Sequence, residues 1–280
     1  MVLTLPYNVL YATDLHGRTN LYRKIFDYAS RKGIEAIIFG GDLTPKNHFS
    51  LEIIIDMQAD FLNRIIIPEI RNFVDECHKD VFLMMGNDDC RINYEILEEG
   101  ERDGLYRILD SHRNRILGFN IIGYSFVPVT PFRLKDWEKY EDEKKQVPPG
   151  YIDLSSPDAI TTTGKINEGS IRQDFAKIKK LSDPSKTIYV IHSPPMDTAL
   201  DITRDGMHCG SRAVRDFIEK EQPYLTLHGH IHESYVMSGK FKEKIGKTLA
   251  LNPGAIYKNN EVSFLVIDLL NPDKAEMVKI

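Results

Sequence analysis

Residues 7–17 read YNVLYATDLHG and residues 36–42 read AIIFGGD. Each stretch is an apolar run with the length of a buried strand, followed by glycine and by side chains that can bind a metal ion. Between them, residues 21–31 place apolar side chains at a helical spacing. A helical stretch at 51–77, with a possible kink at Pro68, and a third strand at 81–85 follow. This β-α-β-α-β order predicts an α/β fold with parallel strands and right-handed crossovers.

The rest of the chain resumes this alternation after an irregular segment. Residues 125–170 are rich in Pro, Thr, Lys and Glu and contain the only tryptophan, Trp137, so we expect them to form a lid or rim. Helices are predicted at 171–181 and 211–221, with strands at 187–191 and 224–227. Short strands are predicted at 235–237, 248–252, 262–268 and 276–279. We therefore expect one domain over residues 1–280, with an insertion at 125–170.

The composition is that of a globular protein. Of 280 residues, 42% are hydrophobic and 28% are charged, which argues against a disordered chain. The net charge of −5 makes nucleic acid an unlikely partner, because proteins that grip it are usually basic. Three cysteines without CxxC spacing predict free thiols, and no apolar run is long enough to span a membrane. We expect a cytoplasmic protein without a membrane partner; the oligomeric state is not predicted.

Metal-binding side chains recur at the ends of the predicted strands. They follow five separate strands and are Asp14, His16, Asp42, Asn87, His192, His230 and His232. Ligands of open α/β sheets bind beyond the carboxyl ends of the strands, so these side chains are expected to meet in one crevice. Carboxylate, amide and imidazole ligands without thiolate suit hard to borderline divalent ions. Seven ligands are too many for one tetrahedral ion and suit two ions that share a bridging carboxylate.

These motifs resemble the ordered signature of a known superfamily. Asp14-x-His16, Gly41-Asp42, Gly86-Asn87, His192 and Gly229-His230-x-His232 are similar to the pattern of the calcineurin-like metallophosphoesterases. The resemblance implies a four-layer α/β/β/α sandwich with two central mixed β-sheets. It also implies a dinuclear metal-dependent phosphoric ester hydrolase, in which a metal-bridged hydroxide attacks a monoester or diester. The expected partner is a small phosphate-ester substrate.

The family pattern implies a role for each ligand. Asp14, His16 and His232 would hold the first ion. Asn87, His192 and His230 would hold the second, and Asp42 would bridge both and share in catalysis. Two divalent ions are therefore the implied cofactors, and Mn, Fe, Zn and Ni all suit these ligands.

Asp88 and His208 are further catalytic candidates. Many members of the superfamily have histidine at the position of Asp88, where a carboxylate would repel a phosphate unless it were protonated or neutralised. Asp88 would act as a general acid or, as we favour, only stabilise a turn. His208 precedes a predicted helix whose start could bind phosphate, although a simple N-cap at Ser211 is favoured. We expect His228 to be structural.

Two other functions compete with a phosphoesterase. A catalytically silent binding scaffold of the same fold would be expected to lack metal ligands, whereas all seven are present and only Asp88 departs from the pattern. A nuclease would use the same metals but would need a basic track for the nucleic-acid backbone, which the acidic net charge disfavours.

Overall fold

The architecture is known from a computed structural model, which describes residues 7–46, 50–255 and 260–280. The first sheet has the strand order β14-β13-β1-β2-β3-β4. Its strands are β1 (Asn8–Ala12), β2 (Ala36–Phe39), β3 (Asp80–Leu83), β4 (Arg107–Ile108), β13 (Ser263–Asp268) and β14 (Glu276–Lys279). Strands β1 to β3 are parallel, as the sequence predicted, β4 adds a further parallel strand, and the two C-terminal strands add an antiparallel edge.

A second sheet has the strand order β11-β12-β10-β9-β6-β5. Its strands are β5 (Asn114–Ile116), β6 (Phe119–Tyr124), β9 (Thr187–Ile191), β10 (Leu225–Leu227), β11 (Lys242–Ile245) and β12 (Thr248–Leu251). The four central strands are parallel and the two edge strands are antiparallel. Both sheets are therefore mixed. Within the 125–170 segment, β7 (Val127–Pro128) and β8 (Glu138–Lys139) form a separate short pair.

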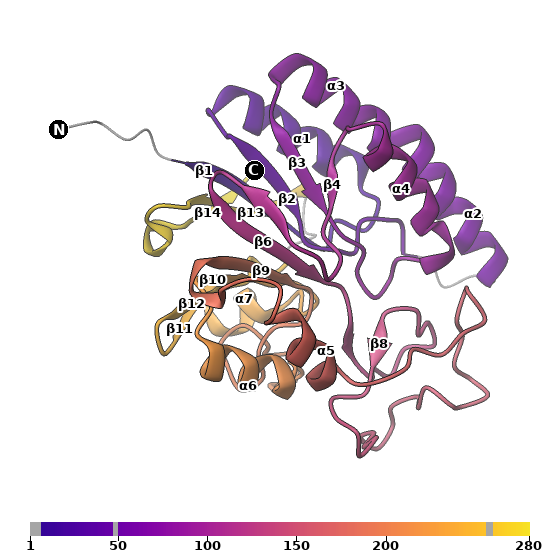
Figure 1. Ribbon diagram of the computed structural model, residues 1–280. Coiled ribbons are helices and arrows are strands. Elements are labelled where there is room, and N and C mark those ends of the chain that lie inside the picture. Colours follow the sequence, from indigo (N-terminus) through magenta and orange to yellow (C-terminus); the bar gives the residue numbers. More distant parts are fainter. Residues whose placement is uncertain (1–6, 47–49, 256–259) are drawn as a thin grey trace.

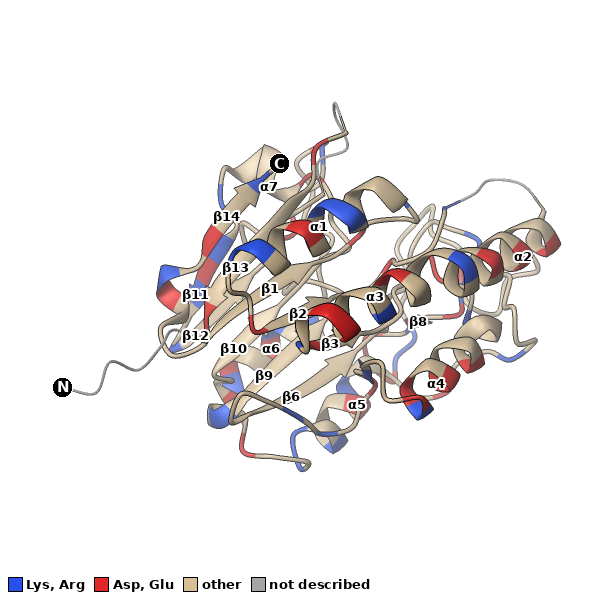
Figure 2. Cartoon of the chain, turned by 90° about the horizontal axis from the view of Figure 1, so that it is seen from above, with Lys and Arg blue, Asp and Glu red and all other residues tan. Residues whose placement is uncertain are grey.

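Helices cover the outer face of each sheet. Figure 1 shows α1 (Thr19–Arg31), α2 (Leu51–Phe61), α3 (Ile67–Cys77) and α4 (Tyr94–Arg102) beside the first sheet. The second sheet is covered by α5 (Ile171–Ile178) and α6 (Arg212–Glu221). The result is the expected four-layer α/β/β/α sandwich. Seen from above in Figure 2, acidic and basic residues are interspersed along α1, α3 and α4. No helix in the described ranges is both long and apolar enough to cross a bilayer.

The core explains why the strands read as unbroken apolar runs. On β1, Val9 and Tyr11 pack between the two sheets, in the same cluster as Ile188 of β9. Leu10 and Ala12 point the other way, into the cluster formed with the helices. All four of these β1 side chains are fully buried, because a strand in the middle of the sandwich has no solvent-facing side. Burial of each large apolar side chain stabilises the fold by about 1.5–3 kcal/mol.

The structure corrects two local predictions. Residues 235–237 were predicted as a strand, but they lie in the short helix α7 (Ser234–Ser238), which ends at Gly239 with a φ of 71°. The side chains of Val236 and Met237 are exposed, so their apolar character did not indicate a buried strand. The long helix at 51–77 changes at a π-helical turn over Leu62–Ile66 rather than at Pro68, which fits into the first turn of α3. The three cysteines are free, as predicted.

Candidate metal centre

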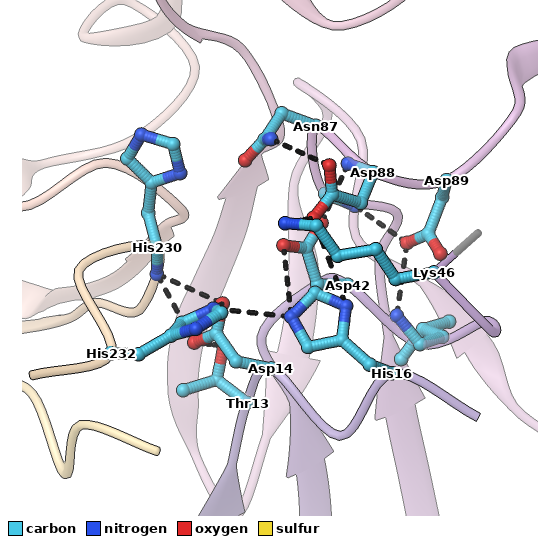
Figure 3. A network of polar contacts seen from close by, with 12 residues as sticks. Thr13, Asp14, His16, Asp42, Lys46, Asn87, Asp88, Asp89, His230 and His232 are labelled. Carbon is cyan, nitrogen blue, oxygen red and sulfur yellow. Dashed lines mark hydrogen bonds and ion pairs between the residues drawn. The ribbon is translucent and has the colours of Figure 1, made fainter. Parts of the chain in front are cut away.

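The loops after five parallel strands carry the predicted ligands to one place. These loops follow β1, β2, β3, β9 and β10. Figure 3 shows side chains from four of them in a single network above the strand ends. The two sheets of the sandwich thus contribute ligands from opposite sides, which is why the seven residues can lie more than two hundred positions apart in the sequence and still meet.

Four of the predicted ligands form the tightest part of the cluster. One ligand atom from each of Asp14, His16, Asp42 and His232 lies within 4.8 Å of the others. The Nε2 atoms of His16 and His232 are 3.1 Å apart. His232 Nε2 is also 3.3 Å from Asp14 Oδ1. Such spacings place nitrogen and oxygen lone pairs around a common point, as a divalent ion requires.

Asp42 connects this group to the remaining ligands. Its Oδ2 atom is 3.7 Å from His16 Nε2 and 3.5 Å from His192 Nε2. His192 Nε2 is in turn 3.2 Å from Asn87 Oδ1. A single carboxylate oxygen therefore lies between two sets of donors. Asp42 therefore connects the two groups of donors.

Backbone hydrogen bonds orient His192 and His230. The Nδ1–H group of His192 donates to the carbonyl oxygen of Gly40 at 2.9 Å, which orients the ring so that Nε2 faces the cluster. The backbone N–H of His230 donates to both carboxylate oxygens of Asp14, each at 3.1 Å. The rings of His192 and His230 are neighbours, with centroids 5.4 Å apart. All seven predicted ligands thus belong to one contact network.

Backbone strain is concentrated in these residues. Asp14, His16, Asp42 and His230 have φ angles of 57°, 45°, 51° and 65°. Side chains with a Cβ seldom adopt this left-handed region, and a strained residue persists only where its surroundings hold it. Four of the seven predicted ligands share this conformation. It turns the backbone sharply just after a strand and directs the side chain into the crevice.

Glycines beside the ligands leave room for them. A Cβ added to Gly86 would collide with the carboxylate of Asp42, and one added to Gly229 would collide with the carboxylate of Asp14. The groups that approach these two glycines closely are therefore the carboxylates of the ligands themselves.

The charge state of the cluster suits a cation. Burial raises the pKa values of Asp14 and Asp42, but nearby histidines outweigh that effect and hold both pKa values below normal. Burial lowers the pKa of His16 to about 4 and that of His230 to about 3, which keeps both rings neutral. Burial also lowers the pKa of His192, yet the attraction of Asp42 outweighs it and raises that pKa to about 10. Two buried carboxylates thus demand positive charge, which a proton on His192 or a bound divalent ion supplies.

Asp89 is a structural residue that the sequence did not reveal. Its side chain is fully buried and accepts hydrogen bonds from the backbone N–H groups of Gly86, Leu43 and Thr44, at 2.8, 3.0 and 2.8 Å. It therefore joins the loop after β2, which carries Asp42, to the loop after β3, which carries Asn87. Burial raises the pKa of Asp89 to about 7, with a further contribution from the Asp42 charge.

Asp88 forms an ion pair that the sequence also left hidden. Its Oδ2 atom lies 2.6 Å from the ammonium nitrogen of Lys46, and Figure 3 shows the Lys46 side chain reaching over the cluster. The backbone N–H of Asp88 donates to Asp42 Oδ1 at 2.8 Å. Asp88 lies in a turn, as favoured from the sequence, and its carboxylate both pairs with Lys46 and accepts from Asn87 Nδ2 at 3.3 Å. No motif marks Lys46, because the pair depends on how two loops meet in space.

A cavity of about 290 Å³ opens over the cluster. Lys46, Asn87, Asp88, His230 and His232 lie on its lining. Residues 129–132 of the irregular segment line it as well. The segment is anchored by Trp137, whose buried Nε1–H donates to the carbonyl oxygen of Asp89 at 3.0 Å. Part of the segment predicted to form a lid or rim therefore borders this cavity.

His208 lies apart from the ligand cluster. It lines a second, neighbouring cavity, and its Nδ1 atom is 2.7 Å from Asp201 Oδ1. Ser211 caps α6 by accepting from the N–H of Val214 at 3.1 Å, as favoured from the sequence. His228 is fully buried, with Nδ1 3.0 Å from the carbonyl oxygens of Ile191 and Ser193, so its contacts are internal ones.

Comparisons with known proteins agree with this geometry. The family model described as calcineurin-like phosphoesterase matches residues 7–234. No curated protein matches the chain. Among solved structures, the protein TT1561 of Thermus thermophilus is similar with a TM-score of 0.63 and 18% identity, over 98% of this chain and 99% of that one. A dimetal phosphatase from Danio rerio is similar with a TM-score of 0.56 and 12% identity, over 99% of each chain. At these identities, the solved structures support the fold alone.

Proposed function

Because the chain belongs to the calcineurin-like phosphoesterase family, we propose that it hydrolyses a phosphate ester with the help of two divalent metal ions. The observation that carries this proposal is the position of Asp42, whose Oδ2 atom lies between His16 and His192. One carboxylate oxygen shared by two groups of donors is what a pair of ions needs.

The donor set fits such ions. Asp14, His16 and His232 would hold one, and Asn87, His192 and His230 the other, with Asp42 shared. Carboxylate oxygens, an amide oxygen and imidazole nitrogens suit Mn, Fe, Zn or Ni. When bound, the ions would lower the pKa of coordinated water and draw charge from the phosphoryl oxygens.

The chain itself supplies a cation for the substrate. The ammonium group of Lys46 lies on the lining of the cavity over the cluster, where a phosphoryl group would enter. Asp88 fixes its position through the 2.6 Å ion pair, and the Lys46 side chain is 35% exposed. A positive charge stabilises a phosphoryl group most effectively when it is already in position before the substrate binds. The ion pair with Asp88 holds the Lys46 ammonium group in such a position. In this arrangement Asp88 positions Lys46 instead of meeting the phosphate directly.

Cys90, three residues after the ligand Asn87, is a poor alternative nucleophile. Burial raises the pKa of the Cys90 thiol to about 12, with help from nearby carboxylates, so it stays protonated and weakly nucleophilic. The side chain of Cys90 is fully buried. The attacking group is proposed to be water that is activated within the cluster.

The proposal is tested with Mn²⁺-loaded protein and two chromogenic substrates, p-nitrophenyl phosphate and bis(p-nitrophenyl) phosphate. We expect turnover of at least one, and a loss of about a hundredfold or more in kcat for Asp42→Asn and His230→Ala. Matched controls are Asp27→Asn and His112→Ala, which alter exposed residues outside the cluster. Turnover that persists unchanged in both cluster variants would contradict the assignment.

A further inference from the structure

A larger cavity adjoins the cavity over the metal centre. The second cavity has a volume of about 590 Å³, roughly twice that of the first. The two share four lining residues, Pro128, Val129, Tyr151 and Cys209. Such sharing means that the cavities meet along a common wall, with Tyr151 and Cys209 facing both. A substrate whose phosphoryl group enters the first cavity can therefore extend into the second.

The second cavity presents hydrogen-bond donors that the protein does not use. Arg212 Nη2 lies 3.3 Å from the weak acceptor Sδ of Met196, and Arg212 forms no ion pair with any described residue. His208 is fixed through Nδ1 by the fully buried Asp201, so its Nε2 atom points away from that carboxylate. The hydrogen bond to Asp201 raises the pKa of His208, which favours the doubly protonated, cationic ring.

The carboxylates of the same lining are already engaged. Glu141 accepts from Ser211 Oγ and from the backbone N–H groups of Arg212 and Ala213, at 3.0, 2.9 and 2.9 Å. Asp142 accepts from the N–H of Lys144 at 2.8 Å. Glu141 thus occupies the start of α6, where the sequence had left phosphate binding as an alternative. The cationic Arg172 is paired with Asp216 at 2.7 Å, which leaves Arg212 and His208 as the available donors.

We propose that this second cavity binds an anionic group on the organic part of the substrate, so that the enzyme prefers phosphate esters that carry a second negative charge. The inference rests on the proposed function, because it places the scissile phosphoryl group over the metal centre. Arg212 and His208 would bind a carboxylate or a second phosphate. Arginine is well suited to either, since its planar group offers two parallel donors.

The proposal is tested by calorimetric titration of Mn²⁺-loaded protein with alkane-1,ω-bisphosphonates of increasing chain length. Alkylphosphonates of matched length serve as references, because their C–P bonds are not hydrolysed and they carry only one anionic group. We expect one bisphosphonate length to bind at least about tenfold more tightly than its monophosphonate, the gain typical of a charge-assisted hydrogen bond near the surface. Equal affinities at every length would overturn the proposal.

Substitutions then identify the residues that cause the tighter binding of the bisphosphonate. Arg212→Gln is expected to reduce the bisphosphonate advantage to about twofold or less, while Arg212→Lys retains part of it. His208→Asn is expected to reduce it as well. Arg115→Gln, on an exposed edge strand, is the matched control and should leave the advantage intact. A gain that survives both Arg212→Gln and His208→Asn would refute the assigned site.

Failure of this inference differs from failure of the proposed function. If the protein cleaves the chromogenic esters but binds both ligand series equally, only the second site is wrong. If it cleaves neither ester, the proposed function is wrong, whatever the calorimetry shows. Circular dichroism and thermal melting of each variant establish that a lost advantage is not caused by unfolding.

Discussion

The ammonium group of Lys46 lies 2.6 Å from the Oδ2 atom of Asp88. This pair gives a role to Asp88, the one position where the sequence departs from the pattern of its family. A lone carboxylate beside the metal centre would repel a phosphate, whereas a carboxylate that holds a lysine over the cavity brings positive charge to it. The ring of Phe132 also contacts this ammonium group, with its centroid 5.1 Å away.

Replacement of Lys46 by Gln is predicted to lower kcat/KM for an aryl phosphate ester by about tenfold to a hundredfold, because a preplaced charge on the phosphoryl group is lost. Lys46→Arg should keep most of the activity. The measurement is steady-state hydrolysis at saturating Mn²⁺, with Lys79→Gln as the control for loss of an ion-paired lysine elsewhere. Equal kcat/KM values for Lys46→Gln and the unmodified protein would exclude this role.

Asp89→Asn is predicted to destabilise the protein by about 1–3 kcal/mol, because an amide nitrogen would face N–H groups that now donate to a carboxylate. The substitution also removes the buried negative charge of Asp89, which the nearby Asp42 charge repels, and this offsets part of the cost. Urea unfolding in the presence of Mn²⁺ measures the difference. A variant at least as stable as the unmodified protein would show that Asp89 does not hold the two loops together.

Removal of divalent metal is predicted to lower the melting temperature. Bound ions neutralise Asp14 and Asp42, and a ligand at a hundred times its Kd stabilises the folded state by about 2.7 kcal/mol. Differential scanning calorimetry with EDTA, and then with excess Mn²⁺, measures this shift in melting temperature. Gly86→Ala should abolish most of it, because the added Cβ occupies the place of the Asp42 carboxylate. A full shift in that variant would be inconsistent with Asp42 as a ligand.

The His208–Asp201 pair is predicted to make a pH-dependent contribution to stability. The pKa of His208 is raised in the folded protein, so its contribution is complete below the ordinary histidine pKa and is lost as pH rises through the folded value. His208→Gln should therefore cost more at pH 5 than at pH 9. The side chain is 38% exposed, so the difference is expected to stay below about 1 kcal/mol after solvent screening. Urea unfolding at both values tests the sign, and a larger cost at pH 9 would contradict it.

Much of the centre could be predicted from the sequence because local chemistry and topology agree there. An apolar strand followed by glycine and a polar side chain fixes where Asp14, Asp42 and Asn87 must lie, at the carboxyl edge of a parallel sheet. The four layers came from the resemblance to the family. The position of His192 after a strand predicted that it would join the same crevice, but only the resemblance indicated a second sheet, which supplies His192 from across the sandwich.

Other features depend on contacts between loops and could not be predicted. The ion pair of Lys46 with Asp88 and the hydrogen bonds of Asp89 each join the loop after β2 to the loop after β3. Loop conformation is set by tertiary contacts, which have no periodic signature in the sequence. Residues 235–237 were mispredicted for the same reason: a short apolar run indicated a strand, but the run lies on a helix with Val236 and Met237 exposed.

The central claim is that the seven ligands hold a pair of metal ions, and elemental analysis after gel filtration tests it most directly. We predict about two equivalents of divalent metal per chain in protein loaded with Mn²⁺, and fewer in His192→Ala and His232→Ala, each of which removes a ligand from one proposed half of the centre. Protein that retains no metal after loading, or a metal content that neither substitution lowers, would contradict the account.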